Sequence, residues 1–443
     1  MTVAAILPGS AAPMARAIAP AAAVRVGSGA PVRLVLERIG YVLFGLFILF
    51  TCFTFIRPSP YDFTAIPTLG LWVLLGIRLH RGAVVFLALL LLHHLGLLLA
   101  LMPHLHEPLP REWTFQSFYL MVTCVFFIMF FSDNTEKRVT LATNAYIASC
   151  LVAAVCGIIS YAAPGSLLFT MDGRAAGVFE DPNVLGSFLT FGVLALLRRL
   201  LTRDTRHPAL TGLALTVVLT AVFLSFSRGA WGATVGGALL TIAFTYRSSA
   251  GPTRRRIAAL AVCGIIGAAL GLTALMSESG IAEQFADRFT LTKDYDEGVT
   301  GRFGNQLRSL SMLLESPNGF GPLRFRVIFD LDPHNSYIGA FANGGWIGGF
   351  SFLGMVLTTA FVGVRLCLVA SPYRRFAQSV VPTVLMYFMQ AMQIDIDHWR
   401  HVYILLGLVW GLECARLRWL AGAPDASRRV HSVRPAERSF ARA

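Results

Sequence analysis

Charged residues are scarce in this sequence of 443 residues: only 14% are Asp, Glu, Lys or Arg, whereas 55% are hydrophobic. A water-soluble domain of ordinary composition carries about 25% charged residues. The shortage of charge therefore argues against a soluble globular protein. A mean hydropathy of +0.64 and repeated apolar runs of about 20 residues favour a polytopic membrane protein instead.

The sequence also lacks the patterns of several enzyme and metal-binding classes. Its seven cysteines all lie inside apolar stretches and form no CxxC pair, so we expect neither a disulfide framework nor a metal cluster. No Walker A, GxGxxG, HExxH or GxSxG motif occurs in the chain. Nothing in the sequence therefore suggests nucleotide hydrolysis, zinc proteolysis or serine hydrolysis.

The net charge of +13, from 37 basic and 24 acidic residues, agrees with a membrane protein. In a soluble protein such an excess can indicate nucleic acid binding, but in a membrane protein basic residues gather on the inner side. We predict an all-α fold of about twelve transmembrane helices, because stretches this long satisfy their backbone hydrogen bonds in lipid as helices. The predicted spans are 34–56, 64–77, 82–102, 114–131, 139–162, 183–199, 208–225, 229–246, 257–276, 345–370, 377–393 and 401–418.

The distribution of arginine predicts the orientation of these spans. When both ends of the chain are placed inside, every inner segment is basic and the alternation never breaks. The basic residues are then a consequence of topology, so nucleic acid is not expected as a partner. The predicted organisation is a disordered cytoplasmic tail (1–33), nine spans (34–276), a large outer loop (277–344), three spans (345–418) and a second cytoplasmic tail (419–443).

The large outer loop is much longer than an ordinary connection between helices. Its residues near 281–292 and 302–315 have helix-like patterns. Apolar residues recur there at near-helical spacing, so these pieces can pack against the membrane domain. We predict that the loop forms a lid or platform above the spans.

Three arginines on the outer side need an individual explanation, because basic residues are depleted there. Arg174 and Arg302 each follow a glycine, and Arg228 opens a span after Ser227. A guanidinium group near the lipid–water boundary is costly unless it faces protein, water or an anion. Its planar fork suits phosphate oxygens. The alternative for each arginine is extension to the interface or a structural pair with a carboxylate.

The strongest local signal is Asp332-Pro333-His334-Asn335, which has the form of a helix start. Asp is favoured at the N-cap and Pro at the first helical position, so we predict that His334 and Asn335 occupy the first turn. Free N–H groups there favour an anion. A histidine can act as a general base, because its ordinary pKa of about 6.5 is close to neutral pH. The alternative is an ordinary interfacial histidine. The sixth span opens in the same way at Asp181.

Two further features accompany this signal. Residues 395–401 form a dense polar and aromatic turn outside the eleventh span. The turn can contact a headgroup or an acceptor sugar, or it can be an aromatic-belt turn held by ion pairs. The glycines after His334 include pairs four residues apart, 344/348 and 345/349, and for these we expect close helix packing as the whole role.

Four segments together resemble the O-antigen ligase and polymerase superfamily of bacterial envelope glycosyltransferases. The match to the His-Asn-x9-Gly-x-x-Gly signature of the ligase branch is the most specific of them. The segments are 174–183 (RAAGVFEDPN, similar to an Arg…Gly-x-Phe…Asp-Pro-Asn loop), 227–231 (SRGAW, similar to a Ser-Arg-Gly segment), 301–302 with 316–321 (GR and SPNGFG, similar to a large-loop arginine and a Pro-x-x-Gly-x-Gly stretch) and 334–348, which carries the His-Asn signature.

The resemblance implies transfer of an O-antigen glycan from undecaprenyl diphosphate to a hydroxyl of the lipid A-core oligosaccharide. It also implies a fold like that of other integral-membrane (GT-C) glycosyltransferases, a place in the bacterial inner membrane with a periplasmic active site, and no metal or nucleotide. In this superfamily arginines bind the diphosphate and a histidine is the proposed base. By motif matching the catalytic residues are His334 and Arg302, and the substrate contacts at the diphosphate are Arg174, Arg228, Arg288 and Asn335.

Other functions stay open at this point. An O-antigen polymerase or a protein O-oligosaccharyltransferase uses the same kind of donor with another acceptor. A lipid flippase or secondary transporter of similar size belongs to a different class, and its site is expected near the membrane centre. The candidate ionisable residues of this chain gather at the outer face instead, which favours the enzyme.

Overall fold

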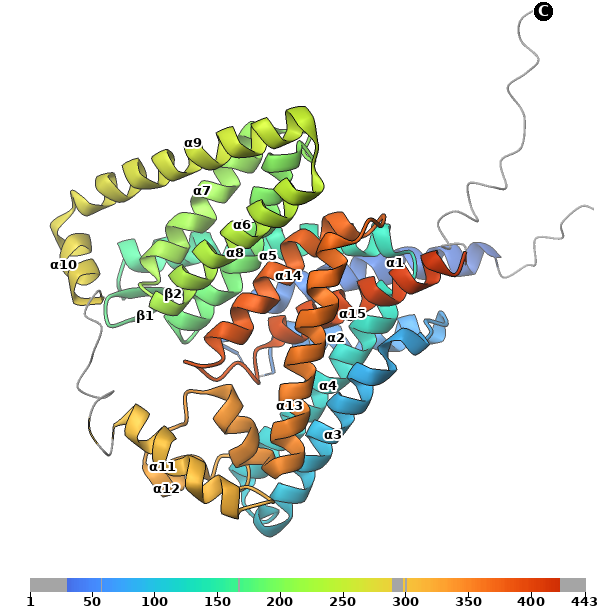
Figure 1. Ribbon diagram of the computed structural model, residues 1–443, viewed down its shortest axis with the longest axis vertical. Coiled ribbons are helices and arrows are strands. Elements are labelled where there is room, and N and C mark those ends of the chain that lie inside the picture. The colour runs from blue at the N-terminus through green and yellow to red at the C-terminus, as the bar shows by residue number, and fades with distance from the viewer. Residues whose placement is uncertain (1–29, 57, 166–167, 289–297, 299–300, 423–443) are drawn as a thin grey trace, which may run out of the picture.

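The computed structural model describes residues 30–56, 58–165, 168–288, 298 and 301–422. This part of the chain is built almost entirely from helices, with one two-stranded hairpin (Figure 1). The elements are α1 (Ala30–Leu49), α2 (Pro60–Leu74), α3 (Val84–Leu101), α4 (Pro108–Phe131), α5 (Thr135–Ala162), β1 (Phe169–Met171), β2 (Arg174–Gly177), α6 (Pro182–Thr202), α7 (Pro208–Leu224), α8 (Arg228–Ser248), α9 (Gly251–Met276), α10 (Ser279–Arg288), α11 (Arg302–Glu315), α12 (Phe325–Phe329), α13 (Ser336–Leu368), α14 (Arg374–Gln390) and α15 (Arg400–Leu420).

Each of the twelve predicted spans overlaps one helix of the structure, from α1 to α9 and from α13 to α15. Seven helices in the described part of the chain are long and apolar enough to cross a membrane, namely α1, α3, α4, α5, α6, α9 and α13. The structure therefore supports an all-α polytopic membrane protein. The total of twelve spans, and with it the crossing by α2, α7, α8, α14 and α15, stays a prediction, as does the GT-C likeness.

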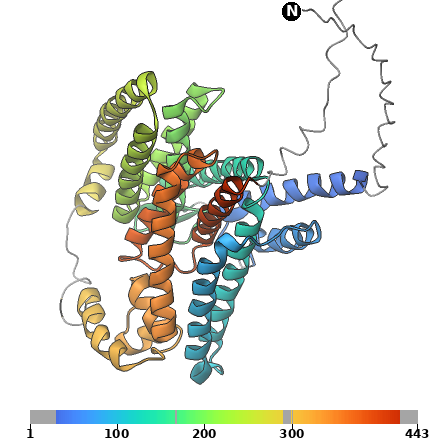
Figure 2. The same cartoon turned by 45° about the vertical axis from the view of Figure 1, so that its right-hand side comes forward.

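Two helices, α6 and α15, form the centre of the bundle. α15 buries every residue from His401 to Arg416, and α6 buries every residue from Leu185 to Leu196. α14 packs against both, while α3 runs along α13 and α4 along α15 (Figure 2). α9 lies at the outer edge of the group α6–α8 and buries only Ile257, so its apolar surface is suited to contact with lipid (Figure 1).

Small residues bring α3 and α13 together, as the glycine spacing predicts. A Cβ atom added at Gly96 of α3 would lie 2.5 Å from both the carbonyl oxygen of Gly344 and the amide nitrogen of Gly348. α13 is bent at Gly345, where φ is 62° and ψ is −162°. The predicted start of a span at 345 therefore marks this bend, whereas the helix itself begins at Ser336.

The large loop predicted to lie outside contains the two helices that its pattern predicts. α11 confirms the predicted piece at 302–315, and α10 ends at Arg288, since 289–297 lie outside the described residues. The expectation that the apolar side of α11 packs on the bundle is wrong, because Leu307 is 71% exposed and Leu314 is 73% exposed. α11 instead turns its more polar side inward and buries Asn305, Ser309 and Leu313.

Candidate active site

A cavity of about 150 Å³ lies where the ends of several helices meet the β hairpin. Four arginines from four different elements line it: Arg174 from β2, Arg228 from α8, Arg288 from α10 and Arg302 from α11. No carboxylate is among the described residues that line this cavity. The other lining residues are Asn183, Phe226, Ser227, Gly229, Gln390, Gln393 and Ile394.

The hairpin places Arg174. Asp172 and Gly173 connect β1 to β2, and both have positive φ values, 51° and 68°, as in the two-residue turns that Asp-Gly favours. Arg174 is 6% exposed, and its Nε donates to the carbonyl oxygen of Ser225 at 2.9 Å. Its Nη2 donates to Asn183 Oδ1 at 2.8 Å. These bonds fix the direction of the guanidinium group.

Arg228 and Arg302 share a position in their helices, because each is the first residue. Ser227 is the N-cap of α8, and Phe226 before it has a positive φ of 45°. Asn183 lies in the first turn of α6. Three helix N-termini therefore border the cavity, and their N–H groups and dipoles favour an anion there.

The predicted helix start at Asp181 is confirmed. α6 begins at Pro182, and Asp181 Oδ1 accepts a hydrogen bond from the backbone N–H of Asn183 at 2.7 Å. This cap holds Asn183 at the cavity, where its side chain receives the bond from Arg174.

Aromatic packing places Arg288 at the end of α10. Phe285, one turn earlier, stacks on Trp231 with ring centroids 5.5 Å apart and on Phe223 at 6.0 Å. α10 is thereby held against the ends of α7 and α8, and its last residue reaches the arginine cavity.

The structure corrects the predicted helix start around His334. α13 begins at Ser336, and its N-cap is Asn335, whose Oδ1 accepts hydrogen bonds from two N–H groups of the first turn at 3.0 and 3.2 Å. Asp332 is not the cap, because both of its carboxylate oxygens are bound by Arg326 at 2.9 Å. His334 precedes the helix in the left-handed conformation, with φ of 43°. A non-glycine residue held in this region is found more often at functional sites.

Hydrogen bonds tie the His334 turn to the arginine cavity. Arg302 Nη2 donates to the carbonyl oxygen of His334 at 3.2 Å and also to that of Gln393. His334 Nδ1 lies 3.7 Å from Asp395 Oδ2, and Asp395 Oδ1 accepts from the backbone N–H of Asn335 at 3.1 Å. Arg302 therefore joins the cavity to the histidine, while Asp395 lies against the imidazole ring.

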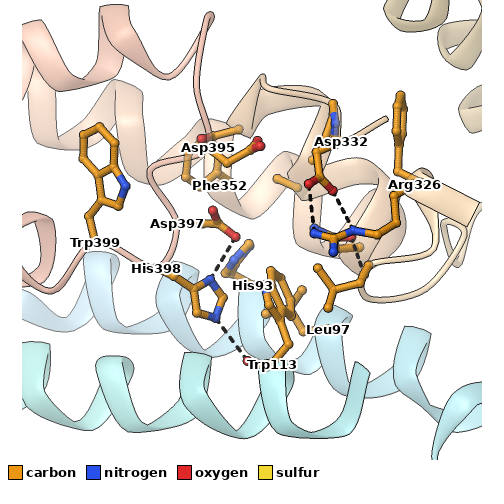
Figure 3. Close-up of a pocket in the computed structure, with 17 residues that line it drawn as sticks. His93, Leu97, Trp113, Arg326, Asp332, Phe352, Asp395, Asp397, His398 and Trp399 are labelled. Carbon is orange, nitrogen blue, oxygen red and sulfur yellow. Dashed lines mark hydrogen bonds and ion pairs between the residues drawn. The ribbon is translucent and has the colours of Figure 1, made fainter. Parts of the chain in front are cut away.

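A second cavity, of about 230 Å³, opens beside Asp395 (Figure 3). Asp397, His398 and Trp399 of the same turn line it together with Trp113 of α4. Burial and the nearby carboxylates raise the pKa of Asp395 to about 7. The dense turn outside the eleventh span therefore lines a cavity, and it is also held by the predicted kind of ion pair, since Arg400 Nη2 lies 2.9 Å from Asp62 Oδ2.

A third, larger cavity of about 730 Å³ adjoins the arginine cavity. Both cavities are lined by Arg228 and Arg302. The rest of the larger one is mostly apolar, with Met386, Met389 and Met392 along it. We call it the methionine groove.

Sequence reasoning missed the contribution of the C-terminal end of α14 and of the turn that follows it. Gln390 and Gln393 line the arginine cavity, and the carbonyl oxygen of Gln393 accepts from Arg302. Neither residue belongs to a recognisable motif, so no local signal marks them. The sequence singles out the turn at 395–401 as dense and polar, but the position of Asp395 beside His334 depends on the fold.

Helices that can cross a membrane, with four arginines around one cavity beside a histidine, define a membrane protein suited to a phosphorylated ligand. Residues 213–353 match the family model described as O-antigen ligase. The match covers about a third of the chain and shows that this segment is similar to the O-antigen ligase superfamily, whose members are glycosyltransferase-like enzymes. No curated protein matches the chain. The matched segment contains Arg228, Arg288, Arg302 and His334, whereas Arg174 lies before it.

Proposed function

We propose that the protein transfers an O-antigen glycan from undecaprenyl diphosphate to a hydroxyl of the lipid A-core oligosaccharide, at the periplasmic face of the bacterial inner membrane. The observation that carries the proposal is the convergence of Arg174, Arg228, Arg288 and Arg302 on one cavity next to His334. The family match supports a function within the O-antigen ligase and polymerase superfamily. We choose the ligase over the polymerase because of the His-Asn signature.

The arginine cavity is the proposed site of the donor diphosphate. As the glycosidic bond breaks, negative charge grows on the phosphate oxygen that leaves with the lipid. Guanidinium groups already fixed in position stabilise such charge with little reorganisation. Arg174 is the clearest example, because it is buried and oriented by Ser225 and Asn183. Asn335 stays a predicted diphosphate contact, although its side-chain oxygen caps α13.

The methionine groove is the proposed site of the polyprenyl chain. It continues from Arg228 and Arg302, so a ligand with a charged head and an apolar tail can occupy both cavities at once. Methionine side chains adapt to irregular apolar ligands. The adjacency of the two cavities therefore favours a lipid diphosphate over a soluble phosphate ester.

The cavity beside Asp395 is the proposed site of the acceptor sugar. Its indole rings and carboxylates are groups that pack on sugar rings and accept bonds from their hydroxyls. An acceptor hydroxyl attacks the anomeric carbon of the donor and passes its proton to His334, while the carbon–oxygen bond to the diphosphate breaks. Because Nδ1 of His334 faces Asp395, Nε2 is the nitrogen that we propose accepts the proton from the acceptor hydroxyl. The products are the glycosylated acceptor and undecaprenyl diphosphate.

Reconstitution tests this proposal. Purified protein is mixed with a lipid-linked glycan and core oligosaccharide, with EDTA and without nucleotide, and transfer is followed on gels. We expect wild-type protein to produce glycosylated core and His334→Ala to lose transfer by about 10²-fold or more, the usual contribution of a general base. His106→Ala, an exposed outer histidine away from the cavities, is the matched control.

The same assay separates the rival functions. A ligase makes no product without the core acceptor, whereas a polymerase extends the lipid-linked glycan in its absence. A flippase moves the donor between leaflets and forms no new glycosidic bond. Extension of the donor alone, or full transfer by His334→Ala, would contradict the proposal.

A further inference from the structure

Another arginine-lined cavity, of about 700 Å³, lies at the far end of α6 from the candidate active site. α6 starts beside the first cavity near Asn183 and ends at Thr202. Its 21 residues extend about 30 Å at 1.5 Å per residue, which equals the thickness of a bilayer hydrocarbon core. One central helix therefore separates two arginine cavities by the width of a membrane, and the second lies on the side predicted to be cytoplasmic.

This cavity at the far end of α6 has a strong excess of positive charge. It lies between the C-terminal end of α6 and the N-terminal parts of α5 and α14. Its lining residues include five arginines and one carboxylate, which are Arg198, Arg199, Arg203, Arg206, Arg375 and Asp204.

Arg198 is the most buried member, since its side chain is only 9% exposed. Its Nη1 donates to Asp204 Oδ2 at 3.0 Å, but its Nε is buried without a hydrogen-bond partner in the described part of the chain. The Nε of Arg375 is also buried without a hydrogen-bond partner in the described part of the chain, although its Nη2 pairs with Glu136. A buried donor of a charged group that has no acceptor costs free energy. A ligand with acceptor oxygens in this cavity would therefore stabilise the two arginines.

We infer that this cavity binds the phosphate group of an anionic phospholipid from the inner leaflet. Basic pockets between transmembrane helices on this side of a membrane suit such headgroups. Thr143 and Ser379 add hydroxyl groups to the guanidinium donors, and Phe376 adds an apolar wall for the glycerol part of the lipid. The place of the cavity at the end of a membrane-spanning helix favours a lipid over soluble inorganic phosphate.

Nanodiscs of phosphatidylcholine, with or without about a third phosphatidylglycerol, provide the test. We expect phosphatidylglycerol to raise the thermal unfolding midpoint of the full-length wild-type protein. The double variant Arg203→Gln/Arg206→Gln should lose this rise, because it removes two of the guanidinium groups that attract the headgroup. Both residues are exposed, so the fold is expected to survive their substitution.

A matched control removes the same charge elsewhere on the same side. Arg247 and Arg255 are exposed and do not line the cavity. Their double Gln variant should keep the phosphatidylglycerol effect. Native mass spectrometry should show a retained phosphatidylglycerol molecule on wild type and control, with at least about tenfold lower occupancy on Arg203→Gln/Arg206→Gln.

Two results would overturn the inference. Equal loss of the lipid effect in both double variants would indicate only non-specific attraction to a charged surface. A rise in the midpoint with inorganic phosphate in pure phosphatidylcholine, and no further rise with phosphatidylglycerol, would make the ligand a soluble anion. Neither readout needs glycan transfer, so the outcome is independent of the proposed enzyme activity.

Discussion

Four guanidinium groups around a small cavity repel one another, and the repulsion is strongest where water is scarce. A dianionic or more highly charged ligand removes the repulsion and gains several charge-assisted hydrogen bonds. At the scale of single residues, the four arginines therefore support the proposed diphosphate site over a site for a sugar or a neutral lipid.

The first prediction concerns Arg228. Arg228→Gln should lower kcat/KM for glycan transfer by about 10²- to 10³-fold, the effect of removing one preorganised donor to a developing anion. Arg228→Lys should recover only part of the loss, because an ammonium group cannot bind two oxygens as a planar fork does. Arg111→Gln, at an arginine of α4 outside the cavity, is the control in the same kinetic assay. A loss of the same size in both Gln variants would contradict a specific role.

The second prediction concerns the stability of the Asp395 turn as a function of pH. Burial and the nearby carboxylates raise the pKa of Asp395 to about 7 in the folded protein, above its ordinary value of 3.8. A raised pKa means that the protonated group favours folding below about pH 4, and this contribution is lost as pH rises through 7. Asp395→Asn stays neutral, so its unfolding midpoint relative to wild type should increase between pH 5 and pH 8.

A neighbouring carboxylate provides the contrast. Burial alone would raise the pKa of Asp397, but the charge and hydrogen bond of His398 outweigh burial and lower it. Asp397→Asn should therefore be less stable than wild type throughout pH 5 to 8. Thermal unfolding in detergent at several pH values measures both variants. A flat difference for Asp395→Asn over this range would refute the assigned environment of that residue.

Sequence reasoning found the arginines but not their neighbours. Arg174, Arg228 and Arg302 stand out because basic residues are rare on the predicted outer side and because each adjoins a turn or helix start. Gln390 and Gln393 carry no such signal, since glutamine near a helix end is common and their role depends on where α14 lies. Contacts between distant segments decide such roles, and one sequence contains no direct record of them.

At the scale of elements, the bend in α13 joins two segments that the sequence shows as separate motifs. Gly345 occupies the bend, and a Cβ atom there would lie 2.3 Å from the carbonyl oxygen of Pro317. The N–H of Trp346 donates to the same oxygen at 2.8 Å, and the N–H of Phe320 donates to Ala342 at 2.7 Å. The loop at 316–321 is therefore seated in the bend, which fixes the outer half of α13.

The third prediction follows from that close contact. Gly345→Ala should destabilise the protein by about 1–3 kcal/mol or more, because the residue has a left-handed φ and no room for a methyl group. Transfer should fall as well, since the outer half of α13 starts just after His334. Gly271→Ala in α9 is the control: its Cβ would meet nothing within 4 Å, and alanine favours a helix. An equal change in thermal midpoint for both variants would contradict the argument.

Helix positions were predictable because long apolar runs and cap residues are local signals. The start of α13 was predicted one turn too early, because Asp332 has the form of a cap and Asn335 was placed in the first turn. Arg326 binds both carboxylate oxygens of Asp332, so Asp332 does not cap the helix and Asn335 is the N-cap of α13. The exposed apolar side of α11 was also missed, since periodicity predicts a face but not what the face contacts.

At the scale of the whole molecule, three cavities meet around one turn. The arginine cavity shares Arg302 with the methionine groove, and Arg302 binds the turn that carries His334. Asp395 lies on the other side of that histidine and borders the cavity of about 230 Å³. A donor lipid, its diphosphate and a sugar acceptor can thus approach one imidazole from separate directions. No single segment of sequence shows this arrangement, because it joins α8, α11, α13 and α14.

The last prediction concerns the methionine groove and compares donors that have a long or a short prenyl chain. Met389→Gln and Met392→Gln place polar amides in the groove, so the double variant should raise KM for an undecaprenyl-linked donor by about tenfold, the cost of about 1.4 kcal/mol of lost apolar contact. A donor with a short, soluble prenyl chain does not fill the groove, and its KM should change little. Met312→Gln, at a partly exposed methionine of α11 outside the groove, is the control. An equal rise in KM for both donors would mean that the substitutions disturb the arginine cavity itself. That result would contradict the proposal that the groove binds the polyprenyl chain.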